Sequence, residues 1–257
     1  MKSKLLFISI LTCSFSALKS QDTLKVMHYN LTYYDEYTTF CTTTNNNVNS
    51  KNGYLVTIMN YMKPDILTVN EMGRNMSGSV NTSATKFLNS VLNTGGVTYY
   101  KRADESGTAS LVNMIFYNSN KVEMYHHELV TKDVNGVNLT RTIDEYTFYY
   151  KAPDLSTTHD TVQFTCIVAH LKAGSTQPDM DERNSETQAL MANLNQKNIR
   201  GNRMFMGDFN VEASTEPCFQ NLVNEPNTKV RFYDPINSLG SWYSNPSFKN
   251  ACSACKY

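Results

Sequence analysis

Arg203-Met204-Phe205-Met206-Gly207-Asp208-Phe209-Asn210 is the stretch of this sequence that says most about the fold. The three apolar residues after the arginine predict a short buried strand, and the polar residues that follow lie where such a strand ends. Gly207 allows a close backbone approach, and Phe209 is expected to point into the core, so that Asp208 and Asn210 face a cleft. A simple turn is the alternative interpretation, because Gly, Asp and Asn all favour turns.

Other segments also place a polar residue at the end of an apolar strand. They are His28-Tyr29-Asn30, Ile66-Leu67-Thr68-Val69-Asn70-Glu71 and Ile167-Val168-Ala169-His170. A strand fixes the backbone while the side chain at its end faces a cleft, so Asn30, Glu71 and His170 join Asp208 and Asn210 as candidate site residues. Taken singly, each has an ordinary explanation as a turn residue, a solvated loop carboxylate or a partly buried histidine.

Apolar periodicity divides the rest of the chain into many short strands and few helices. Helices are predicted over 54–62, ended by Pro64, over 83–92 and over 182–194, with a polar Thr/Asn-rich loop over 42–52. Strands are predicted over 24–29, 66–69, 98–101, 111–117, 122–130, 146–151, 162–170 and 203–206, with a hairpin turn at Asn135-Gly136. This composition favours an α+β fold, a two-sheet α/β sandwich, over a doubly wound parallel sheet.

The length and charge of the chain limit the possible functions. With 257 residues and 40% hydrophobic content, the chain is expected to form one large domain with one site. Lys and Arg number 23, as do Asp and Glu, so the net charge of zero gives no general attraction for nucleic acid. A nuclease would therefore need a local basic groove.

The first 20 residues have the features of a secretory signal peptide, with Lys2 and Lys4 before the apolar run 5–12. We therefore expect residues 21–257 to form a secreted or periplasmic monomer, with a lipoprotein anchored at Cys13 as the alternative. No later segment reads as a transmembrane helix. Without the leader an odd number of cysteines remains, so a full disulfide framework is not expected. Cys252 and Cys255 are interpreted as a local disulfide or as incidental.

The strand-end motifs resemble, together and in this order, those of the endonuclease/exonuclease/phosphatase (DNase I-like) superfamily. The match consists of Asn30, Glu71 in a Pro-Asp-apolar-Glu context, His170 before a short polar loop, and Gly-Asp-Phe-Asn at 207–210. The resemblance extends from Leu24 to about Trp242. It implies a DNase I-like sandwich and a metal-dependent phosphoester hydrolase, in which a bound cation helps a water molecule attack the phosphorus.

The resemblance also implies roles for the candidate residues. Glu71 is the main metal ligand with Asn30 beside it, and the expected metal is Mg²⁺, with Mn²⁺ or Ca²⁺ as alternatives. Asp208 orients or deprotonates the attacking water. Asn210, Asn30 and His170 bind the phosphate, and His170 donates a hydrogen bond to the phosphate or the leaving oxygen. Arg183 and Lys172 are further candidates for phosphate contacts, with solvated charges as the equal alternative.

The sequence departs from the family pattern after residue 242. Family members finish with an Asp on a late strand and an Asp-His pair, but here no histidine follows His170 and residues 248–257 contain no Asp. The chain is therefore expected to lack the final strands of the sandwich, as a truncated copy or as a shorter relative that lost catalysis, with weak or absent hydrolysis. A secreted nuclease is the leading prediction. A phosphatase of inositol phosphates or phospholipid headgroups, and a non-catalytic phosphate- or glycan-binding relative, are the alternatives.

Overall fold

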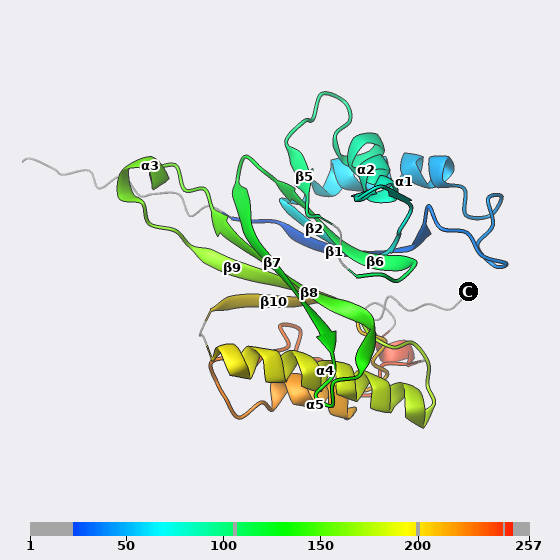
Figure 1. Ribbon diagram of the computed structural model, residues 1–257, viewed down its shortest axis with the longest axis vertical. Coiled ribbons are helices and arrows are strands. Elements are labelled where there is room, and N and C mark those ends of the chain that lie inside the picture. The colour runs from blue at the N-terminus through cyan, green and yellow to red at the C-terminus, as the bar shows by residue number, and fades with distance from the viewer. Residues whose placement is uncertain (1–22, 105–106, 199–200, 244, 249–257) are drawn as a thin grey trace, which may run out of the picture.

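A computed structural model of the protein describes residues 23–104, 107–198, 201–243 and 245–248. Two four-stranded sheets pack face to face and helices cover their outer faces, which gives four layers (Figure 1). This arrangement confirms the predicted two-sheet α+β sandwich. The proposed leader, Cys252 and Cys255 lie outside the described residues.

The first sheet joins strands from the first half of the chain in the order β1-β2-β6-β5. Its strands are β1 (Val26–Tyr34), β2 (Ile66–Gly73), β5 (Tyr100–Arg102) and β6 (Leu111–Asn118). β1 and β2 are parallel, with Asn30 opposite Asn70. Because parallel strands end at the same edge of a sheet, both strand-end motifs of this sheet lie at one edge. A two-stranded ribbon, β3 (Met76–Ser77) and β4 (Val80–Asn81), follows β2.

The second sheet has the strand order β10-β9-β8-β7. Its strands are β7 (Val122–Lys132), β8 (Asn138–Tyr150), β9 (Gln163–His170) and β10 (Asn202–Asp208). β9 and β10 are parallel, with His170 opposite Asp208, so their polar ends also share one edge. The predicted turn at Asn135-Gly136 joins β7 to β8, and Gly136 adopts the positive φ of 82° that such a turn requires.

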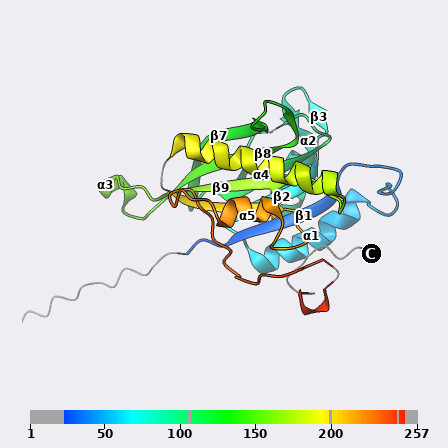
Figure 2. The ribbon, with the colours of Figure 1, turned by 90° about the horizontal axis from the view of Figure 1, so that it is seen from below.

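Helices lie on the outer face of each sheet. α1 (Val48–Met62), α2 (Thr82–Phe87) and the π-helical turn 88–92 cover the first sheet, and α4 (Gln177–Lys197) and α5 (Pro217–Val223) cover the second. Figure 2 shows α4 and α5 side by side over the second sheet. Short helical turns are α3 (Leu155–Thr158) and the 3₁₀ turn Pro246–Phe248. No helix in the described part of the chain is long and apolar enough to cross a bilayer.

The predicted loop over 42–52 is wrong in its second half, because α1 begins at Val48. The side chain of Asn47 accepts hydrogen bonds from the backbone N–H groups of Asn49 and Ser50 and so caps the helix. α1 ends as predicted before Pro64, with Lys63 in the left-handed conformation. The predicted helix 182–194 also begins earlier, at Gln177, where a capping box between Thr176 and Asp179 starts α4.

The core has two parts. The larger cluster fills the space between the sheets and beneath α1 and α2, and includes Phe87, Phe116 and Phe148, each fully buried. The smaller cluster lies between the second sheet and the helices α4 and α5, around Ile167 and Leu190. Both sheets are thus fixed on their two faces, and the loops at their common edge stand on rigid strands. Cys41, Cys166 and Cys218 are free thiols.

Candidate active site

The structure brings the polar ends of β1, β2, β9 and β10 to one rim of the sandwich, and a single side-chain amide joins them. Nδ2 of Asn30 lies 3.0 Å from Oε1 of Glu71 and 3.0 Å from Oδ2 of Asp208. An amide NH₂ has two hydrogens, so it can donate to both carboxylates at once. Glu71 and Asp208 belong to different sheets and are 137 positions apart, counted from their residue numbers, yet both contact the same nitrogen.

Glu71 projects from an irregularity in β2. The residue has a positive φ of 56°, and the pairing of β2 with both neighbours shifts register around it. A bulge of this kind re-aims a side chain at the edge of a sheet, and the backbone energy that a non-glycine residue loses in this conformation must be offset by the contacts around it. The backbone N–H of Tyr33 donates to Oε2 of Glu71 at 3.0 Å, which fixes the carboxylate. Glu71 is therefore held in one direction, toward the rim.

His170 ends β9 beside Glu71. Its Nε2 lies 4.0 Å from Oε1 of Glu71, and its side chain is only 6% exposed. Burial lowers the pKa of His170, and nearby Arg141 lowers it further, while Asp208 and Glu71 oppose the shift. The imidazole is consequently neutral at pH 7 and keeps one N–H available as a hydrogen-bond donor.

Asp208 and Asn210 form a tight turn after β10. Oδ1 of Asp208 accepts a hydrogen bond from the backbone N–H of Asn210 at 3.2 Å, and Nδ2 of Asn210 donates to the carbonyl of Leu171 at 3.0 Å. The backbone of Gly207 lies so close to β9 that an added Cβ would stand 1.8 Å from the carbonyl oxygen of Ala169. Only glycine fits there, which explains its place before Asp208.

The acidic groups at the rim suit a hard divalent cation. Mg²⁺ is bound through oxygen ligands, keeps several waters and needs only one or two carboxylates, and Glu71 can supply one while Asp208 lies beside it. Among the described residues, no three His, Cys, Asp or Glu side chains form a ready-made metal cluster. Oδ1 of Asn30 accepts from the backbone N–H of Thr32, so its amide turns nitrogen, a donor, toward the carboxylates. Metal ligation by Asn30 requires this amide to turn over.

His28 also lies close to the rim. Its Nδ1 contacts Oγ1 of Thr68 at 3.0 Å, and its Nε2 is buried without a hydrogen-bond partner among the described atoms. Burial lowers the pKa of His28 to about 4, against the opposing charge of Asp208. The signal available in the sequence was the two-residue spacing from Asn30, which places both side chains on one face of β1.

Arg183 has a structural role in place of the phosphate contact considered for it from the sequence. Arg183 is fully buried, and its Nε and Nη2 donate to Oε2 of Glu216 at 3.0 and 2.9 Å. Its Nη1 donates to the carbonyls of Lys172 and Gly174. The Lys172 ammonium pairs with Asp179 at 3.1 Å. The prediction for Arg183 was wrong because a charge within a helical segment was taken to face solvent or ligand, whereas this guanidinium holds the loop that follows His170.

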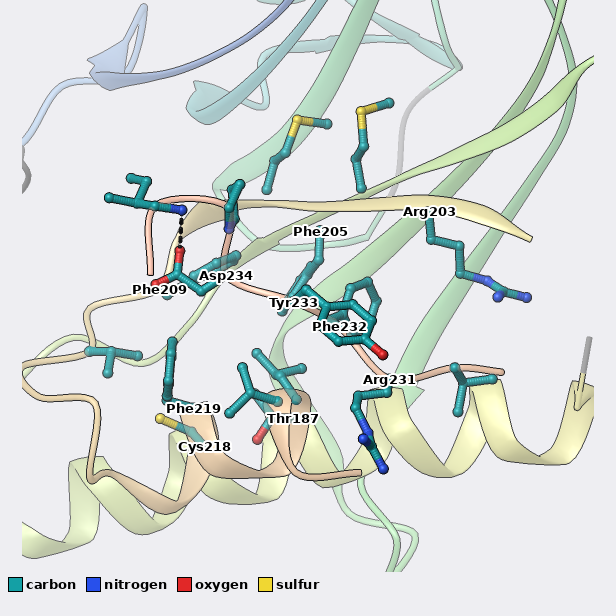
Figure 3. A pocket seen from close by; sticks show the side chains of 18 of the residues that line it. Thr187, Arg203, Phe205, Phe209, Cys218, Phe219, Arg231, Phe232, Tyr233 and Asp234 are labelled. Atoms are coloured by element: carbon teal, nitrogen blue, oxygen red, sulfur yellow. Dashed lines mark hydrogen bonds between the residues drawn. The ribbon is translucent and has the colours of Figure 1, made fainter. Parts of the chain in front are cut away.

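An apolar cavity of about 870 Å³ lies between β10, α5 and the segment 228–242. Figure 3 shows the aromatic side chains of Phe205, Phe209, Phe219 and Phe232 within it. None of the five candidate site residues is among the described residues that line this cavity. The cavity is lined instead by Leu171 and Phe209, the neighbours of His170 and Asp208 along the chain, so it adjoins the rim without including the rim side chains.

Comparison of the structure with solved structures identifies the fold. The human Nocturnin catalytic domain superposes with a TM-score of 0.54 at 15% sequence identity, over 79% of this chain and 70% of that one. The chain has the fold of the endonuclease/exonuclease/phosphatase family. An endonuclease/exonuclease/phosphatase family protein from Bacteroides thetaiotaomicron matches this fold with a TM-score of 0.53 at 14% identity, over 80% of this chain and 70% of that one.

A mannosyl-6-phosphatase from Bacteroides thetaiotaomicron shares the endonuclease/exonuclease/phosphatase fold to the same degree, with a TM-score of 0.53 at 14% identity, over 79% of this chain and 70% of that one. No protein-family model and no curated protein sequence matches the chain. The structural likeness confirms the fold expected from the strand-end motifs, and the fold places those motifs at one rim.

Proposed function

We propose that this protein hydrolyses phosphoester bonds with the help of a divalent cation, Mg²⁺ first, with Mn²⁺ or Ca²⁺ as alternatives. The observation that carries the proposal is the contact of one Asn30 amide with both Glu71 and Asp208, at 3.0 Å each, at the common rim of an endonuclease/exonuclease/phosphatase fold. Two carboxylates held together on rigid strands are what a hard cation and an attacking water both need.

The geometry suggests a division of labour. A cation bound at Glu71 would neutralise charge on the phosphoryl oxygens. Asp208, anchored on the other sheet, orients the attacking water and accepts its proton. The neutral His170 donates its N–H to a phosphoryl or leaving oxygen, and Asn210, at the turn after Asp208, contacts the phosphate. These assignments follow the family resemblance, and the arrangement of the five side chains supports them.

For the substrate we propose nucleic acid, a phosphodiester, as the first candidate. A small phosphomonoester, such as a sugar phosphate, an inositol phosphate or a lipid headgroup, is the second. The second is favoured by the net charge of zero, which gives no general attraction for a polyanion, and by the matching fold of a mannosyl-6-phosphatase. A local basic groove beside the rim would favour the first.

The test is hydrolysis of plasmid DNA, RNA and small phosphomonoesters by the full chain, with added Mg²⁺ or Mn²⁺ and with chelator. We expect weak cleavage that chelator abolishes, and a loss of roughly 10²–10³-fold in rate for Glu71→Gln, typical of removing an electrostatic catalytic group. Glu123→Gln is the matched control, because Glu123 lies on β7, outside the rim, and pairs with Lys151. Cleavage indifferent to chelator, or equal rates in both variants, refutes the proposal. Phosphate binding without any turnover leaves only a non-catalytic relative.

A further inference from the structure

A buried hydrogen-bonded network of polar residues crosses the sandwich directly behind the rim. The backbone N–H of Asp208 donates to Oδ1 of Asn70 at 2.7 Å, and Nδ2 of Asn70 donates to Oδ1 of Asn113 at 2.7 Å. Nδ2 of Asn113 in turn lies 2.8 Å from Oδ2 of Asp144 on β8. Asp144 also contacts Tyr146 and His127. This network therefore links the two sheets twice, through the backbone N–H of Asp208 at one end and through the carboxylate of Asp144 at the other.

The orientation of each side-chain amide in this network is fixed from both ends. The N–H of Asp208 can only donate, so Asn70 must turn its oxygen toward Asp208 and its NH₂ toward Asn113. At the other end the NH₂ of Asn113 faces acceptors only, namely the carbonyls of Thr142 and Val168 and the carboxylate of Asp144. A flipped Asn113 would set its oxygen against these acceptors, so neither amide can turn over alone.

Burial makes this orientation costly to lose. Asn70 and Asp144 are fully buried and Asn113 is 3% exposed, amid the apolar core between the sheets. A buried donor or acceptor left without a partner costs about 1–3 kcal/mol, so the native set of bonds outweighs partly broken arrangements. Apolar side chains could fill such a space without these requirements. Compared with apolar packing, the polar network adds a fixed orientation of the two amides and a fixed distance between the segments that they join.

We infer that Asn70 is a positioning residue that sets the separation between Glu71 and Asp208. It precedes Glu71 on β2, and it binds the backbone of Asp208 on β10, so one residue joins the two carboxylates across the two sheets. Asn113 holds the Asn70 amide in the direction that makes this link. The inference rests on the proposed function, and it assigns to Asn70 the spacing on which cation binding at the rim depends.

The test compares Asn70→Leu and Asn70→Ala with Asn52→Leu. Asn52 is a matched control because it lies on α1, outside the rim. Its Oδ1 accepts a hydrogen bond from the hydroxyl of the fully buried Tyr34 at 2.7 Å. Asn70→Ala guards against failure to fold, because the space it leaves is polar and can take a water. The readouts are the ¹H–¹⁵N resonance and hydrogen exchange of the Asp208 amide, and the affinity for Mn²⁺ measured by calorimetry.

We expect both Asn70 variants to shift the Asp208 amide upfield, speed its exchange and weaken Mn²⁺ binding by about 10-fold, the lower end of the range for outer-shell partners of metal ligands. Asn52→Leu is expected to lose stability and to leave the Asp208 amide resonance and the Mn²⁺ affinity unchanged. Wild-type Mn²⁺ affinity in both Asn70 variants overturns the inference, whatever happens to the Asp208 amide. If the wild-type protein binds no Mn²⁺ and cleaves nothing, the proposed function fails. In that case the Asp208 amide still tests, independently of the proposed function, whether Asn70 holds the backbone of Asp208.

Discussion

The buried ion pair between Arg183 and Glu216 is predicted to hold together the two loops that follow the rim strands. Arg183 donates to the carbonyls of Lys172 and Gly174, in the loop after β9. Oε1 of Glu216 accepts from the backbone N–H of Glu212 at 2.6 Å, in the loop after β10. Glu216→Gln keeps the size of the side chain but leaves a buried guanidinium without a counterion.

The size of the effect follows from burial. The side chain of Arg183 is 0% exposed and that of Glu216 is 6% exposed, so water can solvate neither charge. Breaking such a pair by removing one partner costs about 3–5 kcal/mol. A domain of this size loses roughly 2–4 °C in melting temperature per kcal/mol, so the expected decrease is roughly 6–20 °C. The pair of Glu123 with Lys151 is 31% and 32% exposed, and its loss in Glu123→Gln is expected to cost about 0–1 kcal/mol.

Calorimetry gives both melting temperatures, and hydrogen exchange followed by mass spectrometry locates the damage. Glu216→Gln is expected to lose protection in the peptides that cover 171–176 and 209–216, while those of β7 and β8 keep theirs. If Glu216→Gln lowers the melting temperature by no more than Glu123→Gln does, the ion pair between Arg183 and Glu216 does not secure the loops. Loss of protection spread evenly over the chain would equally refute the reasoning.

Gly207→Ala is expected to lower the free energy of unfolding by at least about 3 kcal/mol, because the new methyl group would stand 1.8 Å from the carbonyl oxygen of Ala169. Gly53→Ala in α1 is expected to raise the free energy of unfolding by about 0.5–1 kcal/mol, because no atom lies within 4 Å of the added methyl group. Urea unfolding measures both, and shifts of the same sign would contradict the packing argument. Burial raises the pKa of Glu186 to about 7, against the opposing hydrogen bond from the Lys172 N–H. The folded state therefore binds more protons than the unfolded state between about pH 4.5 and 7, so Glu186 lowers stability as pH rises through that window. Glu186→Gln is expected to match wild type near pH 5 and exceed it by up to about 3 kcal/mol at pH 8, and parallel stability–pH curves for the two proteins would rule this out.

The strands and the rim residues could be read from the sequence because their signals are local. An apolar run such as Ile66 to Val69 predicts a buried strand wherever it occurs, and a polar residue just behind it must lie at an edge. The start of α1 was missed because residues 48–52 lack apolar periodicity, and the capping side chain of Asn47 looked like one more loop asparagine. The first part of β8 was missed for a related reason: residues 138–142 are exposed or half-buried and show no repeating apolar side, and the buried Asp144 and Glu145 that follow are polar.

Long-range contacts are what the sequence could not supply. Asn70 stands beside Glu71 in a motif that draws attention to the carboxylate, and nothing near it points to Asp208, 138 residues away. The same holds for Arg183, whose partner Glu216 is 33 residues distant. Both side chains are polar and buried, so their value depends on a specific partner rather than on hydrophobicity. At this rim, local patterns identify groups suited to the proposed chemistry, whereas the buried polar contacts between distant segments hold those groups in the arrangement that the structure shows.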